Sequence, residues 1–117
     1  MSEMCWVVNA TKKEQLHFTH IGAATPREFA GTPAAAAIVT WYLCANRGDA
    51  ITFISDYDDF DNLPFGMKAE ELDAWPDKTD EIVNVLVEQG ILEDCGRRFE
   101  DETDPQNVYI RDLRNCW

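Results

Sequence analysis

One almost uninterrupted apolar stretch, residues 34–45, most constrains how this chain can fold. Thr32 and Pro33 precede it and form a typical helix start, because threonine caps free amides and proline at the first helical position loses no hydrogen bond. Polar residues 46–48 follow and end in a glycine, which favours the left-handed conformation that closes helices. Because the stretch is apolar on nearly all sides, we expect a central helix with Trp41 and Leu43 in the core.

The remaining patterns predict an α+β fold. Strands are expected at 4–8, 15–21, 50–54 and 108–110, and helices at 33–47, 55–63, 67–75 and from 77 or 79 to 89. The first two strands are separated by polar residues and predict an N-terminal hairpin. Gly90 followed by Ile91 has the order that commonly closes a helix, and Cys95-Gly96 is typical of a turn. The 117 residues contain no repeat or long linker, so we expect residues 1–117 to form one small domain.

The negative charge is concentrated in one part of the chain. The formal net charge is −12, yet residues 49–104 hold 18 acids and four bases, a net charge of −14, while 1–48 and 105–117 each carry +1. Carboxylates spread over a folded face can imitate the spaced phosphates of nucleic acid and steer a protein to basic clefts. The expected partner-binding residues are Asp56, Asp58, Asp59, Asp61, Glu70, Glu71, Asp73, Asp77, Asp80 and Glu81.

Aromatic residues alternate with these acids. They are Tyr57, Phe60, Phe65, Trp75 and Phe99. Where such rings are exposed, they provide the anchors that carry much of the energy of protein interfaces. A simpler interpretation of the acidic run 56–61 is a solvated turn with Tyr57 and Phe60 facing the core.

Residues 80–113 resemble the end of a winged-helix domain. The helix closes with LVEQGIL at 86–92, Arg97-Arg98-Phe99 follows, and residues 108–110 return as a strand. The resemblance implies duplex DNA binding, with helix 78–89 in the major groove and loop 95–107 on the backbone. Phosphate contacts require lysine and arginine, however, and this helix offers mainly acids, with only Lys78 opposing them. We therefore expect that the usual function of such a domain has been lost.

In composition, the chain resembles the small acidic proteins of phages and mobile elements that inhibit restriction or CRISPR enzymes (anti-restriction or anti-CRISPR type), some of which are DNA mimics. The resemblance implies a non-enzymatic protein that docks on a Lys/Arg-rich site of a nucleic-acid-binding protein, without binding nucleic acid directly. The alternative is a winged-helix transcriptional regulator or antitoxin-like protein that binds DNA through Arg97 and Arg98 or as part of a basic complex. A small enzyme of unrecognised type is a third class.

No motif predicts catalytic, cofactor-binding or metal-binding residues. The run from Asp56 fails the EF-hand pattern, because its sixth position is Asp61 where glycine is required. His17 and His20 are three apart in an expected strand and would face opposite sides. A Cys44–His17 nucleophilic pair stays open, although Cys44 lies in an apolar helix where thiols are normally inert.

The expected location is the cytoplasm, or the host cytoplasm if the protein is phage-encoded. Residues 1–4 contain no basic region before a long apolar run, which a secretion signal would have. The apolar stretch 34–45 is too short to cross a bilayer, so we expect no membrane association. The four cysteines stand singly, without zinc or redox spacing, and should be reduced.

Overall fold

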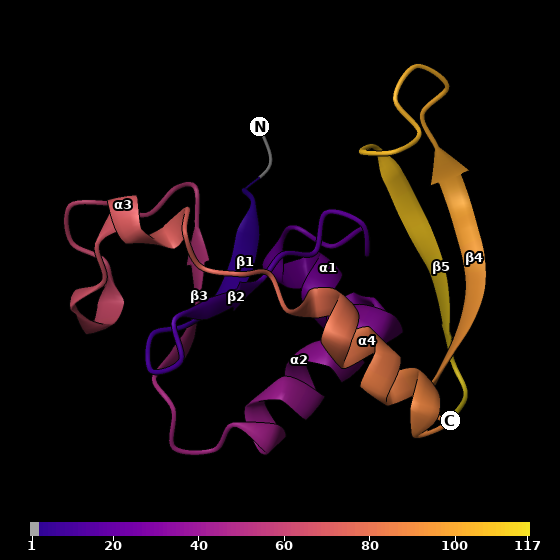
Figure 1. Ribbon diagram of the computed structural model, residues 1–117, viewed down its shortest axis with the longest axis horizontal. Coiled ribbons are helices and arrows are strands. Elements are labelled where there is room, and N and C mark those ends of the chain that lie inside the picture. The colour runs from indigo at the N-terminus through magenta and orange to yellow at the C-terminus, as the bar shows by residue number, and fades with distance from the viewer. Residues whose placement is uncertain (1–2) are drawn as a thin grey trace.

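The computed structural model describes residues 3–117 and has the α+β fold that the sequence predicts (Figure 1). The strands are β1 (Cys5–Asn9), β2 (Glu14–Leu16), β3 (Ile51–Ser55), β4 (Leu92–Glu100) and β5 (Tyr109–Asn115). The helices are α1 (Pro26–Gly31), α2 (Pro33–Ala45), α3 (Ala69–Leu72) and α4 (Thr79–Glu88), with a 3-10 turn, η1 (Pro64–Gly66). In the described part of the chain, no helix is long and apolar enough to cross a membrane.

The N-terminal hairpin β1–β2 is confirmed and is extended by β3 into a sheet of order β2-β1-β3, antiparallel throughout. Successive side chains of a strand point to opposite faces. Val7 therefore joins the main core, whereas Val8 joins a second core with Ile54. The sheet is thus covered on both faces, by helices on one and by the segment after β3 on the other.

Strand β2 ends earlier than expected, at Leu16. The chain then turns, with the amides of Ile21 and Gly22 both donating to the carbonyl of Phe18, and Gly22 has a φ of 85° that favours glycine. The expectation that His17 and His20 lie on opposite faces of one strand is therefore wrong. Each histidine instead has its own aromatic neighbour, described below.

Helix α2 begins at Pro33, as predicted, and buries Ala34, Ile38 and Tyr42 in the main core. These residues are four apart and so lie on one face of the helix. Trp41 is partly buried and packs against the main core, whereas Leu43 is 44% exposed, so the expectation that Leu43 belongs to the core is wrong. An apolar helix packed on one side leaves part of its surface in solvent whatever its composition.

A buried polar network joins the hairpin to α2. The Tyr42 hydroxyl donates to the Glu14 carboxylate and accepts a hydrogen bond from Asn9 Nδ2, which also donates to Asp49 (2.9 Å). Asn9 is fully buried, so these partners satisfy groups that would otherwise be costly. Burial, together with the bond to Glu14, raises the pKa of Tyr42 well above its usual value, and the hydroxyl therefore stays protonated.

Helix α4 closes as predicted. Gly90 has a φ of 73°, its amide donates to the carbonyl of Val87, and the Ile91 amide donates to that of Leu86. These two hydrogen bonds form a Schellman motif. The predicted turn at Cys95-Gly96 is wrong, because both residues lie within β4, where the pairing register with β5 shifts next to Gly96.

The order α4, β4, β5 follows the winged-helix resemblance of residues 80–113, which stays a prediction. Strand β3 pairs with β1 and not with the C-terminal hairpin β4–β5.

The acidic helix expected at 55–63 is absent, because residues 56–62 form turns. The Asp58 carboxylate accepts from the Ser55 amide, and the Ser55 hydroxyl accepts from the Tyr57 amide. Such local bonds from serine and aspartate compete with helix formation. The helix expected at 67–75 is reduced to the four residues of α3.

Candidate functional site

Residues 56–73 form a protrusion that we call the acidic lobe. It contains seven acids and one lysine, a net charge of −6 over those residues. Figure 1 shows this segment, with α3, on the side of the molecule opposite to the β4–β5 hairpin. Buried Leu63, Met67 and Leu72 pack against the sheet residues Val8 and Ile54. The lobe is therefore an ordered surface rather than a loose loop.

Three aromatic rings of the lobe are exposed: Tyr57 by 57%, Phe60 by 38% and Phe65 by 59%. The interpretation that Tyr57 and Phe60 face the core is therefore wrong, because Leu63, Met67 and Leu72 occupy that position. Of the other aromatics that alternate with the acids, Trp75 is buried in the lobe's core and Phe99 is exposed on the distant hairpin. The acidic lobe thus combines carboxylates with exposed aromatic rings.

The carboxylates of the lobe divide into two groups. Asp56 accepts from the Met4 amide, Asp58 from the Ser55 amide and Asp59 from the Asp61 amide, so these three shape the turns. Within residues 3–117, four lobe carboxylates have neither a hydrogen bond nor an ion pair: those of Asp61, Glu70, Glu71 and Asp73. These four are exposed and available to a partner.

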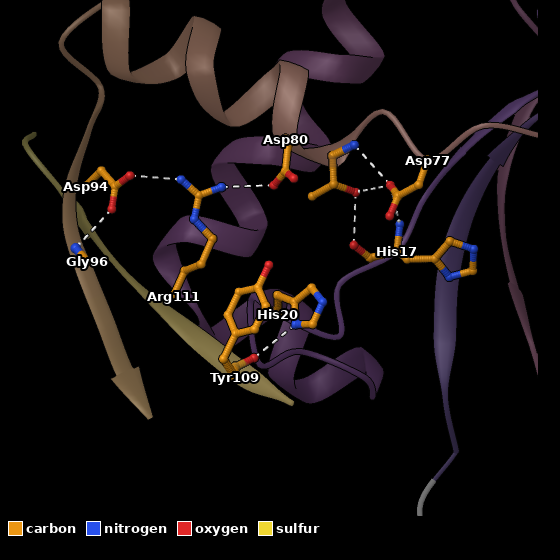
Figure 2. A network of polar contacts seen from close by, with 9 residues as sticks. His17, His20, Asp77, Asp80, Asp94, Gly96, Tyr109 and Arg111 are labelled. Atoms are coloured by element: carbon orange, nitrogen blue, oxygen red, sulfur yellow. Dashed lines mark hydrogen bonds and ion pairs between the residues drawn. The ribbon is translucent and has the colours of Figure 1, made fainter. Parts of the chain in front are cut away.

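The other three predicted partner-binding residues lie outside the lobe and have partners within the chain, and Figure 2 shows those of Asp77 and Asp80. Asp77 accepts hydrogen bonds from the backbone amide of His17 and from the amide and hydroxyl of Thr79. Asp80 is paired with Arg111, and Glu81 with Lys78. The ten predicted acids therefore do not form one uniform face. The candidate site consists of the seven that lie in the acidic lobe.

The C-terminal hairpin is attached to the body by Arg111, whose side chain is only 16% exposed. Its guanidinium lies 2.9 Å from a carboxylate oxygen of Asp80 on α4 and 2.9 Å from one of Asp94 on β4 (Figure 2). Its backbone amide donates to the carbonyl of His20, whose ring stacks on Tyr109 with centroids 3.8 Å apart. We call these contacts of Arg111 with Asp80, Asp94 and His20 the Arg111 clamp. Because Arg111 is paired within the chain, it is less available for a phosphate of DNA.

Acidification should loosen this clamp. The Gly96 amide and then Arg111 lower the pKa of Asp94, so its folded-state pKa lies below the unfolded one. The stabilisation is present above the usual aspartate pKa of about 4 and is lost as pH falls through the depressed value. As the pH is lowered, we expect the hydrogen-exchange protection factor of the Arg111 amide to fall at a higher pH than that of the Ile38 amide in α2. Asp94→Asn should make the Arg111 protection less dependent on pH, whereas simultaneous loss at both amides would contradict the local opening.

The cysteine and histidine side chains of the described residues bear on the pairing that the sequence left open. Burial raises the pKa of the Cys5 thiol, the opposite of what activates a nucleophile. The open pair Cys44–His17 is not brought together: His17 stacks on Trp6, whereas Cys44 lines a hollow of α2 with Trp41 and Ala45. In the described residues, no group of three or more His, Cys, Asp or Glu side chains is placed to hold a metal ion.

Comparisons of this chain with protein-family models, with curated proteins and with solved structures find no match. The function must therefore be argued from the geometry of the acidic lobe.

Proposed function

We propose that this chain is a non-enzymatic binding protein whose acidic lobe docks on a Lys/Arg-rich site of a nucleic-acid-binding protein and blocks access of DNA or RNA to that site. It would act as a DNA-mimic inhibitor in the cytoplasm, or in the host cytoplasm if the gene belongs to a phage. The observation that carries the proposal is the lobe itself, which presents four carboxylates without partners in residues 3–117, beside three exposed aromatic rings.

Physical chemistry favours a basic protein surface as the occupant of this lobe. Exposed like charges on a small folded surface create a potential that accelerates encounters with an oppositely charged cleft by about 10- to 1,000-fold. Aromatic side chains that become desolvated at the centre of an interface then supply most of the binding energy. The lobe combines both properties within residues 56–73.

Direct DNA binding through the hairpin is less well supported. Three of its four arginines have carboxylate partners: Arg97 pairs with Glu100, Arg111 with Asp80 and Asp94, and Arg114 with Asp112. Within residues 3–117 Arg98 has no ion pair and is exposed. A phosphate contact by Arg97, Arg111 or Arg114 would have to compete with one of these internal carboxylates, which leaves Arg98 as one arginine among many nearby acids. We therefore expect no shift of duplex DNA by this chain at low salt, whereas a winged-helix regulator would bind it.

Phe65 provides a test of the lobe as an interface. It is 59% exposed and has a φ of 59°, a left-handed conformation that is unfavourable for a bulky residue. Such strain costs about 1–3 kcal/mol and is tolerated where it serves a function. Because asparagine tolerates this conformation, Phe65→Asn should leave the free energy of unfolding unchanged or raise it by about 1 kcal/mol, while affinity for the partner falls by about tenfold or more.

A suitable control is Phe99→Thr, which removes an exposed aromatic ring from strand β4. The hairpin that contains β4 lies on the side of the molecule opposite to the lobe (Figure 1). Both variants are compared with wild type by urea unfolding and by surface plasmon resonance. If Phe65→Asn destabilised the protein yet bound normally, the ring would serve the fold and not the interface.

The proposed function is tested by capture of the partner and by its kinetics. Tagged protein is incubated with a lysate of the source cells, and retained proteins are identified by mass spectrometry. The association rate of the purified partner should fall as salt rises, because screening limits the reach of exposed charges to about 10 Å at 0.1 M ionic strength. A partner without basic surface, or an association rate independent of salt, would contradict the proposal.

A further inference from the structure

A small pocket lies where the acidic lobe meets the N-terminal hairpin, with a volume of about 200 Å³. The residues that form it and that matter here are Trp6, Gln15, His17, Phe60, Leu72 and Asp73. Pockets for drug-sized ligands usually have volumes of about 300–1,000 Å³. This pocket is therefore better suited to a single side chain than to a metabolite.

The aromatic wall of the pocket is fixed by hydrogen bonds. The indole Nε1–H of Trp6 donates to Gln15 Oε1 (3.2 Å). The amide nitrogen of Gln15, which is itself buried, donates to the backbone carbonyls of Leu72 (2.8 Å) and Trp75 (2.9 Å). Gln15 thereby connects the Trp6 ring to the lobe and sets its orientation, as a preorganised binding site requires.

Two further rings complete the wall. His17 stacks on Trp6 with ring centroids 5.6 Å apart and an angle of 20° between planes. Its ring points away from the Asp77 network, which holds only the His17 backbone (Figure 2). Phe60 contributes from the lobe and is 38% exposed. Three aromatic rings thus line the pocket, and aromatic rings attract cations through their quadrupoles.

A carboxylate stands beside these rings. Asp73 lines the pocket and is exposed, and it makes no hydrogen bond or ion pair with any other residue of the range 3–117. No lysine or arginine lines the pocket. Aromatic faces next to an unpaired carboxylate match a guanidinium group, which stacks flat on a ring and donates two parallel hydrogen bonds to a carboxylate. An ammonium group lacks the planar face and the paired donors.

We propose that this pocket receives the side chain of one arginine from the basic partner, stacked on Trp6 and Phe60 and hydrogen-bonded to Asp73. The proposal rests on the proposed function, because it names the group of the partner that the lobe recognises. It also gives the two features separate roles: the carboxylates of the lobe attract any basic surface, whereas the pocket, with the fixed Trp6 ring near Asp73, selects arginine.

The test uses N-acetyl-L-arginine amide as a probe, with uncharged N-acetyl-L-citrulline amide as its near-isosteric control. The ¹H–¹⁵N signal of the Trp6 indole, assigned with Trp6→Phe, is followed during titration of the wild-type chain. We expect the arginine probe to shift this signal and the citrulline probe to leave it unmoved. Asp73→Asn should lower the affinity of the chain for the arginine probe by about tenfold or more, since it removes a charge-assisted hydrogen-bond pair.

The matched control is Glu70→Gln, which removes one negative charge from α3 at a residue that does not line the pocket. It should lower the affinity for the probe by less than about twofold. Phe60→Ala should also lower the affinity for the arginine probe. The melting temperature should be retained, because Phe60 is partly exposed. An unmoved Trp6 signal, or equal weakening by Asp73→Asn and Glu70→Gln, would overturn the pocket proposal. The salt-dependent capture experiment decides the proposed function separately, because it does not depend on Asp73.

Discussion

Replacement of three lobe acids by lysine, in the triple variant Asp61→Lys, Glu70→Lys and Glu71→Lys, is expected to slow association with the captured partner by about 10- to 100-fold. These side chains are exposed and have no partner in residues 3–117, so the change reverses charge without removing an internal contact. Asp58 and Asp59 are left intact, because their carboxylates close the turns of the lobe. The measurement is the association rate by surface plasmon resonance at low and high salt.

A control with the same change in net charge separates docking from general electrostatics. The triple variant Glu88→Lys, Glu93→Lys and Glu102→Lys alters exposed acids at the end of α4 and on the hairpin, outside the lobe. We expect it to slow association by less than about threefold, because exposed charges more than about 10 Å from the contact are largely screened. Equal slowing by both triple variants would mean that total charge, and not the lobe, governs binding.

Ile38→Ala in α2 is expected to lower the free energy of unfolding by about 2–5 kcal/mol. The side chain is fully buried in the main core, so its truncation loses apolar contacts and leaves a cavity. Urea unfolding followed by circular dichroism measures the effect, and the slope of the transition should stay unchanged if only stability is altered. Alanine is also the best helix former, so any loss reports packing rather than helix propensity.

Leu43→Ala on the same helix is the matched control. Leu43 is 44% exposed, and its truncation should lower the free energy of unfolding by only about 0.5 kcal/mol. If Leu43→Ala destabilised the chain as much as Ile38→Ala, the side of α2 assigned to solvent would be covered in solution, for example by a second copy of the chain.

The sequence predicts the regular elements where the signal is local. Thr32-Pro33 marks the start of α2, and Gly90-Ile91 marks the end of α4, because each pair has a conformational role that does not depend on distant residues. Local patterns do not predict the structure of the acidic lobe. At Ser55 and Asp58 the pattern is that of a helix start, yet their side chains close turns, and no helix follows.

The candidate site is predicted only in part, because the pairing of charges is long-range. Asp80 and Arg111 are 31 positions apart, and nothing in the local sequence indicates that one neutralises the other. The same holds for the pocket, which joins Trp6 on β1 to Asp73 after α3. The alternation of acids with aromatic residues was the available signal, and it locates the lobe but not the pocket.

Displacement of DNA from the captured partner tests the central claim most directly. Fluorescent duplex DNA is bound to the purified partner, and the wild-type chain or the Asp61/Glu70/Glu71 triple variant is added while fluorescence anisotropy is recorded. The account predicts that wild type releases the DNA in proportion to the complex formed, and that the triple variant releases little at the same concentration. Simultaneous binding of DNA and wild-type chain to the partner, or equal displacement by the triple variant, would contradict it.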